Sequence, residues 1–89
     1  MRAVITVVGK DTVGILAQVS AECAAHHINV AEVTQSILQD MFAMIMMVEI
    51  DGCDIPFTEF AEKLETIGRN MGLSIHVMHE DLFNAMHTI

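Results

Sequence analysis

The residues with the clearest chemical potential lie in the segment Gly9–Leu16, where a predicted strand leads into a predicted helix. The first N–H groups of a helix have no partners inside the helix and carry partial positive charge. Gly14 has no Cβ, so a ligand can approach this backbone closely, and a carboxylate is the group that would bind there. The alternative is structural: Asp11 or Thr12 caps the helix, and Gly14 only allows tight packing.

Asn29 is a second candidate, because it stands at the head of the second predicted strand. Its side-chain amide both donates and accepts hydrogen bonds. It can therefore hold both the amine and the carboxylate of an amino acid. The alternative is that Asn29 is a turn residue, which is a common use of asparagine.

Hydrophobic periodicity places these residues in a framework of strands and helices. Alternating or β-branched runs predict strands, and apolar residues spaced by three or four predict helices. Strands are predicted over 1–8, 28–38, 41–50 and 73–78, and helices over 13–26, 56–71 and 80–86. Gln39–Asp40 is predicted to be a tight turn, and Gly72 to be the C-cap of the second helix.

This order is β-α-β-β-α-β with a C-terminal helix, which predicts an α+β, ferredoxin-like fold. In that fold two helices cover one face of a four-stranded antiparallel sheet. A chain of 89 residues has room for one domain, so residues 1–89 are predicted to form a single unit. Hydrophobic residues make up 53% of the chain, which excludes a disordered protein.

The third predicted strand, 41–50, is apolar at nearly every position instead of alternating. Its residues divide between two faces: Phe42, Met44, Met46, Val48 and Ile50 on one, and Met41, Ala43, Ile45 and Met47 on the other. Because two helices cover only one face, the other face needs a different cover, and a homodimer or higher homo-oligomer is predicted. Two alternatives are a C-terminal helix folded back across the sheet and a methionine-rich surface that adapts to a partner.

The chain also resembles a known family in its opening segment. The run Gly9-Lys10-Asp11-Thr12-Val13-Gly14-Ile15-Leu16-Ala17-Gln18-Val19-Ser20, followed by His27-Ile28-Asn29-Val30, is similar to the pattern of an ACT domain. The C-terminal stretch His79-Glu80-Asp81-Leu82-Phe83-Asn84-Ala85-Met86-His87 resembles the small bacterial proteins that consist of a single ACT domain with no attached enzyme. The resemblance covers essentially the whole chain.

The resemblance implies a regulatory module that binds an amino acid or related metabolite between two copies of the domain. The ligand-binding positions that it implies are Asp11, Thr12, Gly14, Ile15 and Asn29. Two residues depart from the family pattern. Val13 stands where many members carry a proline, and Asp11 stands where the serine-binding branch carries an asparagine. Because an aspartate attracts an amine but repels a carboxylate, these departures leave open which ligand binds, and whether one binds.

Charge and cysteine content exclude several other classes of function. Twelve Asp and Glu against four Lys and Arg give a net charge of -8, so neither nucleic acid nor an anionic membrane is an expected partner. Met1 and Arg2 lead directly into the residues of a predicted strand without the apolar core of a signal peptide, and no apolar run approaches the roughly 20 residues of a membrane span. Cys23 and Cys53 form no C-x-x-C motif, and they predict reduced thiols that do not pair in a cytoplasmic protein.

Catalytic, metal and cofactor sites are not predicted. His76 and His79 are three apart on a strand and point to opposite faces, while His26 and His27 diverge at a helix end. No serine or cysteine nucleophile has a recognisable catalytic context. The sequence therefore predicts no enzyme, but a ligand-binding regulatory module. The alternative function is a dimeric protein–protein interaction module with no small ligand.

Overall fold

Strands and helices follow one another along the chain in the predicted order. The computed structural model describes residues 1–10 and 14–86. The elements are β1 (Arg2–Lys10), α1 (Ile15–Ala25), β2 (Asn29–Leu38), β3 (Met41–Glu49), α2 (Phe57–Met71), β4 (Ser74–His79) and α3 (Glu80–Met86). This order confirms the α+β, ferredoxin-like fold with its short C-terminal helix.

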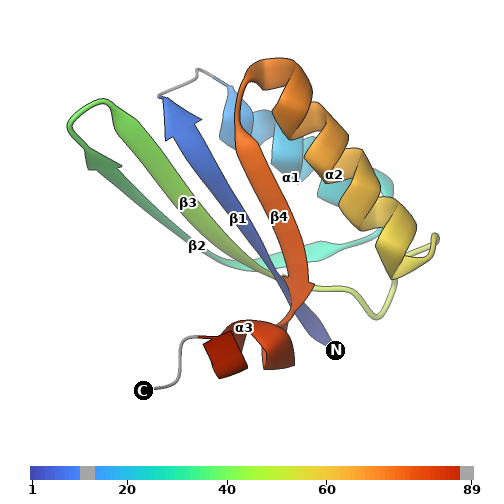
Figure 1. Cartoon of the computed structure of the whole chain (residues 1–89). Coiled ribbons are helices and arrows are strands. Elements are labelled where there is room, and N and C mark those ends of the chain that lie inside the picture. Colours follow the sequence, from blue (N-terminus) through green and yellow to red (C-terminus); the bar gives the residue numbers. More distant parts are fainter. Residues whose placement is uncertain (11–13, 87–89) are drawn as a thin grey trace.

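The four strands form one antiparallel sheet in the order β2-β3-β1-β4. Figure 1 shows α1 and α2 together on one face of the sheet, and α3 beyond the end of β4. We call the face under α1 and α2 the inner face, and the opposite face the outer face. The α3 end of the sheet is the end where β1 begins and β4 leads into α3. The hairpin end is where β2 turns into β3 through Gln39 and Asp40.

The core lies between the inner face and the two long helices. On β3, Phe42, Met44, Met46 and Val48 are buried. They pack with buried residues of the helices, namely Val19 and Cys23 on α1, and Phe60 and Leu64 on α2. The alternation along β3 confirms the predicted division of its side chains between two faces.

A glycine sets how closely α2 approaches β4. Gly68 continues the buried stripe of α2 that begins at Phe60 and Leu64. A Cβ at Gly68 would lie 2.8 Å from Cγ1 of Ile75 and 3.0 Å from the carbonyl oxygen of Leu73. The absence of a side chain therefore allows the helix backbone to lie against β4.

Both long helices end in a residue with left-handed backbone conformation. At the end of α1 this residue is His27, with φ 60°, and at the end of α2 it is Gly72, with φ 74°. In both helices the next N–H group, of Ile28 or of Leu73, donates to the carbonyl five residues earlier at 2.8 Å. This is the Schellman arrangement, which satisfies carbonyl groups at a helix end. It confirms the predicted C-cap of α2 and adds one at α1.

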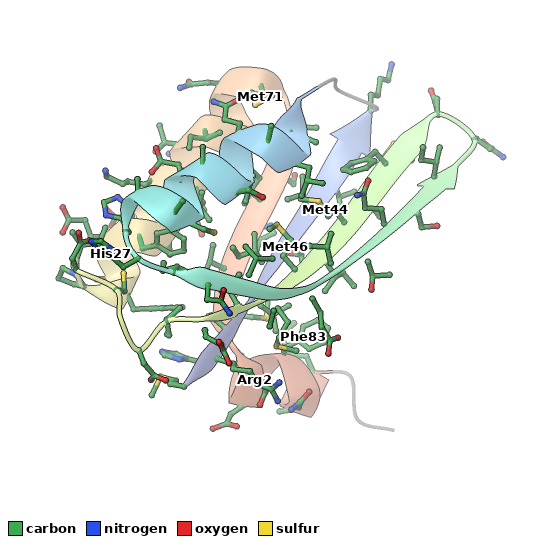
Figure 2. All side chains as sticks on the ribbon, turned by 180° about the vertical axis from the view of Figure 1, so that it is seen from behind. Arg2, His27, Met44, Met46, Met71 and Phe83 are labelled. Atoms are coloured by element: carbon green, nitrogen blue, oxygen red, sulfur yellow. The ribbon has the colours of Figure 1, made fainter. Side chains whose placement is uncertain are left out.

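The outer face is covered at one end only. Val4 and Val8 both point outward from β1, yet Val4 is 0% exposed and Val8 is 43% exposed. The difference is α3, which contacts β1 and β4 at the α3 end. Figure 2 shows Phe83 of α3 close to the strands. The C-terminal helix does fold back across the sheet, and it is too short to cover the whole outer face.

In the part of the chain that the structure describes, each helix is too short or too polar to cross a membrane.

Candidate functional site

Gly14 lies at the N-terminus of α1 with an uncovered backbone. Its φ is 87° and its ψ is 2°, a left-handed conformation that favours glycine. A Cβ at this position would meet no atom of residues 1–10 or 14–86 within 4 Å. Gly14 therefore does not serve tight packing, contrary to the structural alternative raised for it. The space beside this backbone is open to a ligand.

No side chain of the described residues offsets the positive character of the start of α1. Gly14 is the N-cap residue, and no described side chain forms a capping hydrogen bond there. The first turn also carries no Asp or Glu. The partial positive charge of the helix start is thus not balanced by these nearby side chains. An anionic group such as a carboxylate fits this position by charge and by hydrogen bonding.

The other predicted residues of this loop divide into two groups. The side chain of Ile15 is buried in the core at 3% exposure, so Ile15 can offer a ligand only its backbone N–H. Its burial fixes the first turn of α1 against the sheet. Asp11 and Thr12 lie outside the described residues, and their part in the site stays a prediction.

Asn29 is the first residue of β2 and lies on the surface. Its Nδ2 donates a hydrogen bond to Oε1 of Glu49 at 2.9 Å. Glu49 in turn pairs with Arg2 in the register of the sheet, so Asn29 belongs to the α3 end. The interpretation of Asn29 as a turn residue is wrong, because the residue already pairs with β3.

Gly14 and Asn29 do not meet within one chain. Gly14 follows the hairpin end of β1, whereas Asn29 lies at the α3 end. The nine residues of β1 separate the two ends by about 26 Å at about 3.3 Å per residue. A pocket that uses both residues therefore has to take them from two different copies of the chain.

The edge strand β2 is suited to such a contact. The strand order leaves β2 with one unpaired side in the described sheet. Val33 and Ile37 point to the inner face, where they pair with Met46 and Phe42, but they lie beyond the cover of the helices. Ile37 is 60% exposed. An edge strand with exposed apolar side chains is a site for pairing with another strand.

A polar cluster at the end of α1 was not predicted from the sequence. Nδ1 of His26 lies 2.8 Å from Oδ1 of Asp54, and its Nε2 lies 3.2 Å from Nζ of Lys63. The lysine ammonium can only donate, so Nε2 is assigned as the acceptor and Nδ1 carries the proton that is donated to Asp54. This bond holds the pKa of Asp54 below its usual value.

The polar cluster connects three separate segments of the chain. His26 is the C-cap residue of α1, Asp54 belongs to the loop before α2, and Lys63 lies on α2. Three segments that are distant in sequence are thus joined at one ring. His26 is separated from Asp54 by 28 positions and from Lys63 by 37 positions, and local sequence patterns do not predict contacts over such separations.

The two cysteines are free, as predicted. Cys23 is buried on the inner side of α1, and burial is the main cause that raises its pKa to about 11. Such a thiol stays protonated at neutral pH and is a poor nucleophile. Cys23 therefore acts as a small apolar core residue.

The α3 end also holds a cavity of about 630 Å³ beside Arg2, His79 and Glu80. Its charged groups contact each other: Nη2 of Arg2 lies 2.6 Å from Oε2 of Glu80. Among residues 1–10 and 14–86, no three His, Cys, Asp or Glu side chains are grouped so that they could hold a metal ion.

Comparison with known proteins places the chain in a family. The family model described as ACT domain matches residues 2–78. A UPF0237 protein of Listeria monocytogenes is 43% identical over 89 residues, with 100% of both chains covered.

Solved structures agree with this match. The structure of an ACT domain protein from Streptococcus pneumoniae superimposes with a TM-score of 0.79 at 30% identity, covering 100% of this chain and 97% of that one. The regulatory subunit of aspartate kinase from Thermus thermophilus superimposes with a TM-score of 0.65 at 26% identity, covering 85% of this chain and 49% of that one. The chain therefore belongs to the ACT domain family, whose members are regulatory ligand-binding modules.

Proposed function

We propose that this protein is a regulatory module that binds an amino acid, or a closely related metabolite, between two copies of the chain. The observation that carries the proposal is the left-handed Gly14 at a helix start where no described side chain caps the helix or fills the space beside the glycine. Backbone N–H groups of the first turn of α1 bind the carboxylate of the ligand there. The family relationship supports a regulatory rather than a catalytic role.

The amine of the ligand needs acceptors of its own. Asp11 supplies a carboxylate on the same loop, with Thr12 beside it, and Asn29 supplies an amide oxygen. In this chain Nδ2 of Asn29 donates to Glu49, which fixes how the amide is turned. A second copy has to bring Asn29 to the loop, because one chain holds the two at opposite ends.

An antiparallel pairing of β2 with the β2 strand of a second copy achieves this. It would extend the sheet across both chains and place the α3 end of one copy beside the hairpin end of the other. Asn29 of one copy then lies at the same end as Gly14 of the other. The exposed Ile37 on the edge strand would become covered in the same step.

Thermal denaturation with each of the twenty amino acids tests the proposal. A ligand at one hundred times its Kd stabilises the folded state by about 2.7 kcal/mol per site. For a domain of this size the Tm should then rise by roughly ten degrees or more. A complete absence of shifts across the panel and its common metabolic derivatives would exclude the proposal.

Gly14→Ala is the decisive variant, because its new Cβ enters the space that the ligand needs. Gly72→Ala is the matched control, since Gly72 also has a left-handed backbone and open space around it. Both variants should lose similar stability without ligand, about 1 kcal/mol. Only Gly14→Ala should lose the ligand-induced shift in Tm.

Asn29→Ala tests the contribution of the second copy. Its control is Glu49→Ala, which removes the same Asn29–Glu49 hydrogen bond but keeps the amide. Asn29→Ala should abolish the shift in Tm, and Glu49→Ala should retain most of it. Equal binding by both variants would show that the ligand uses the Gly14 loop without Asn29.

The second candidate function is a dimeric protein–protein interaction module without a small ligand. The exposed apolar side chains Val33 and Ile37 on the edge strand favour it. It becomes the better description if the protein forms dimers through β2 while no amino acid changes its Tm.

A further inference from the structure

The outer face of the sheet consists of rows of side chains that the strand register places side by side. One row at the α3 end joins Glu32, Met47, Val4 and Met78 across the four strands. Val4 in this row is fully buried, and α3 contacts its strand. The two rows toward the hairpin end join Thr34, Ile45, Thr6 and His76, and then Ser36, Ala43, Val8 and Ser74. We call these two rows, with Met41 and Lys10 beyond them, the open half.

The open half exposes apolar side chains in its centre. Val8, Met41 and Ile45 are each exposed by more than two fifths. They lie on β1 and β3, the two middle strands of the sheet. Large apolar side chains on the central strands of a sheet are normally covered, and here α3 stops short of them.

The helix that covers the other half is itself apolar on its far side. Phe83 is half-buried against the sheet, while Leu82 is 54% and Met86 is 62% exposed. A seven-residue helix therefore carries apolar side chains both toward its own sheet and away from it. The exposed side of α3 is apolar, so it is chemically suited to cover the exposed apolar side chains of the open half.

We propose that a second copy of the chain covers the open half, with its α3 seated on Val8, Met41 and Ile45. A two-fold axis makes the contact reciprocal, so that each α3 covers its own α3 end and the partner's open half. Two α3 helices then lie side by side between two outer faces. Such an isologous contact uses the same patch on both chains and closes without further copies.

Charge supports a second copy as the occupant. Two chains that each carry a net charge of -8 repel each other, and carboxylates that face one another in the contact would add to this repulsion. The described side chains of the open half include none, although the chain has twelve Asp and Glu. Lys10 and His76 lie there instead. The partner's α3 brings Asp81 in its first turn, whose charge is opposite to that of Lys10, while Glu80 stays paired with Arg2 of its own chain at 2.6 Å.

This contact is independent of the proposed ligand site. It uses the outer face, whereas the ligand site uses the Gly14 loop and the β2 edge. If both contacts form, four chains assemble, and each contact can be broken without the other.

The test is the assembled mass of variants in sedimentation velocity at micromolar concentration. Ile45→Glu places a charge in the centre of the open half and should halve the mass of the assembly. The matched control is Ala21→Glu, which adds the same charge on the exposed side of α1 and should leave the mass unchanged. Leu82→Glu should halve the mass from the helix side of the same contact.

A pair of complementary variants checks that these two surfaces meet. Ile45→Lys and Met86→Glu should each assemble poorly alone and should recover the larger mass when mixed. A wild-type protein that sediments as single chains overturns the proposal. So does an Ile45→Glu variant with the wild-type mass, because the open half would then lie outside any contact between copies. Ile45→Glu should keep any ligand-induced shift in Tm, so a loss of assembly is distinguishable from a loss of ligand binding.

Discussion

The two ends of the sheet differ in how far their side chains and backbone groups are covered. At the α3 end, α3 covers Val4, the amine of Met1 lies 2.6 Å from Asp51, and Asn29 donates to Glu49. At the hairpin end, Val8 and Ile37 remain exposed and Gly14 leaves an open backbone. The same strands run through both ends, so the difference comes from what the chain places on them.

This difference shows which part of the sheet the chain covers by itself. A chain of 89 residues cannot bury the ends and both faces of a four-stranded sheet by itself. It covers part of the α3 end with its own α3, and it leaves apolar side chains of the hairpin end exposed. Our proposals for a ligand and for a second copy both use groups at the hairpin end.

The largest expected effect comes from placing a charge at equivalent positions of the two ends. Val4→Asp buries a carboxylate under α3 and should lower the free energy of unfolding by about 4 kcal/mol or more. Val8→Asp should lower it by less than about 1 kcal/mol, because the carboxylate stays in water. Urea unfolding measures both, at concentrations low enough to keep the chains separate. Equal losses would show that α3 does not distinguish the two ends.

Removal of α3 should make the two ends alike. A chain that stops after His79 exposes Val4 and the half-buried Met47 and Met78. The lost burial corresponds to roughly 3 kcal/mol of unfolding free energy. The control is Leu82→Ala, whose side chain is already mostly exposed, with an expected loss within about 0.5 kcal/mol. If the truncated chain kept its full stability in urea, the cover over Val4 would have no energetic role.

Substitutions at the ends of the two long helices should change the free energy of unfolding by smaller amounts and in opposite directions. His27, at the α3 end, holds a left-handed conformation that favours glycine, so His27→Gly should stabilise the fold by about 0.5 kcal/mol. Gly72, before β4 at the hairpin end, should lose about 1 kcal/mol on change to alanine. Thermal unfolding of both variants checks the two signs. A loss of stability in His27→Gly would mean that the histidine side chain contributes more than its backbone costs.

The smallest effect is a dependence on pH at the α3 end. The pKa of Asp54 is lowered in the folded state by its hydrogen bond with His26. The unfolded chain therefore binds the proton more readily, and folding stability falls as the pH drops below about 3.8, the ordinary value of the group. Asp54→Asn should remove this part of the acid dependence in urea unfolding between pH 5 and pH 2. A variant whose acid profile matches that of the wild type would contradict the assignment.

Most of the fold follows from local patterns in the sequence. The spacing of Phe60, Leu64 and Gly68 identified the buried side of α2, and Gly72 its end. The continuous apolar run of β3 predicted two faces that both need cover, and the outer face has α3 over one half only. How far α3 extends across that face depends on the angle at which it packs on the sheet. The spacing of apolar residues in the sequence does not predict this angle.

The site was less accessible to sequence reasoning. Gly14 and Asn29 were predicted to contribute to one pocket between two copies of the chain. Their separation within one chain follows from topology: β1 and β2 are parallel strands joined by α1, so the end of β1 lies far from the start of β2. The contacts of His26 with Asp54 and Lys63 depend on packing between distant segments. Short-range patterns therefore located the candidate loop but could not show which residues gather around it.

The central position of β1 also determines when the molecule can fold during its synthesis. β1 is made first, yet it lies between β3 and β4, and Ala3 pairs with His79 near the other end of the chain. A growing chain that lacks β4 leaves one side of its middle strand without a partner. Contacts so distant in sequence slow folding relative to a helical protein of equal length. We therefore expect the sheet to close only after β4 has left the ribosome.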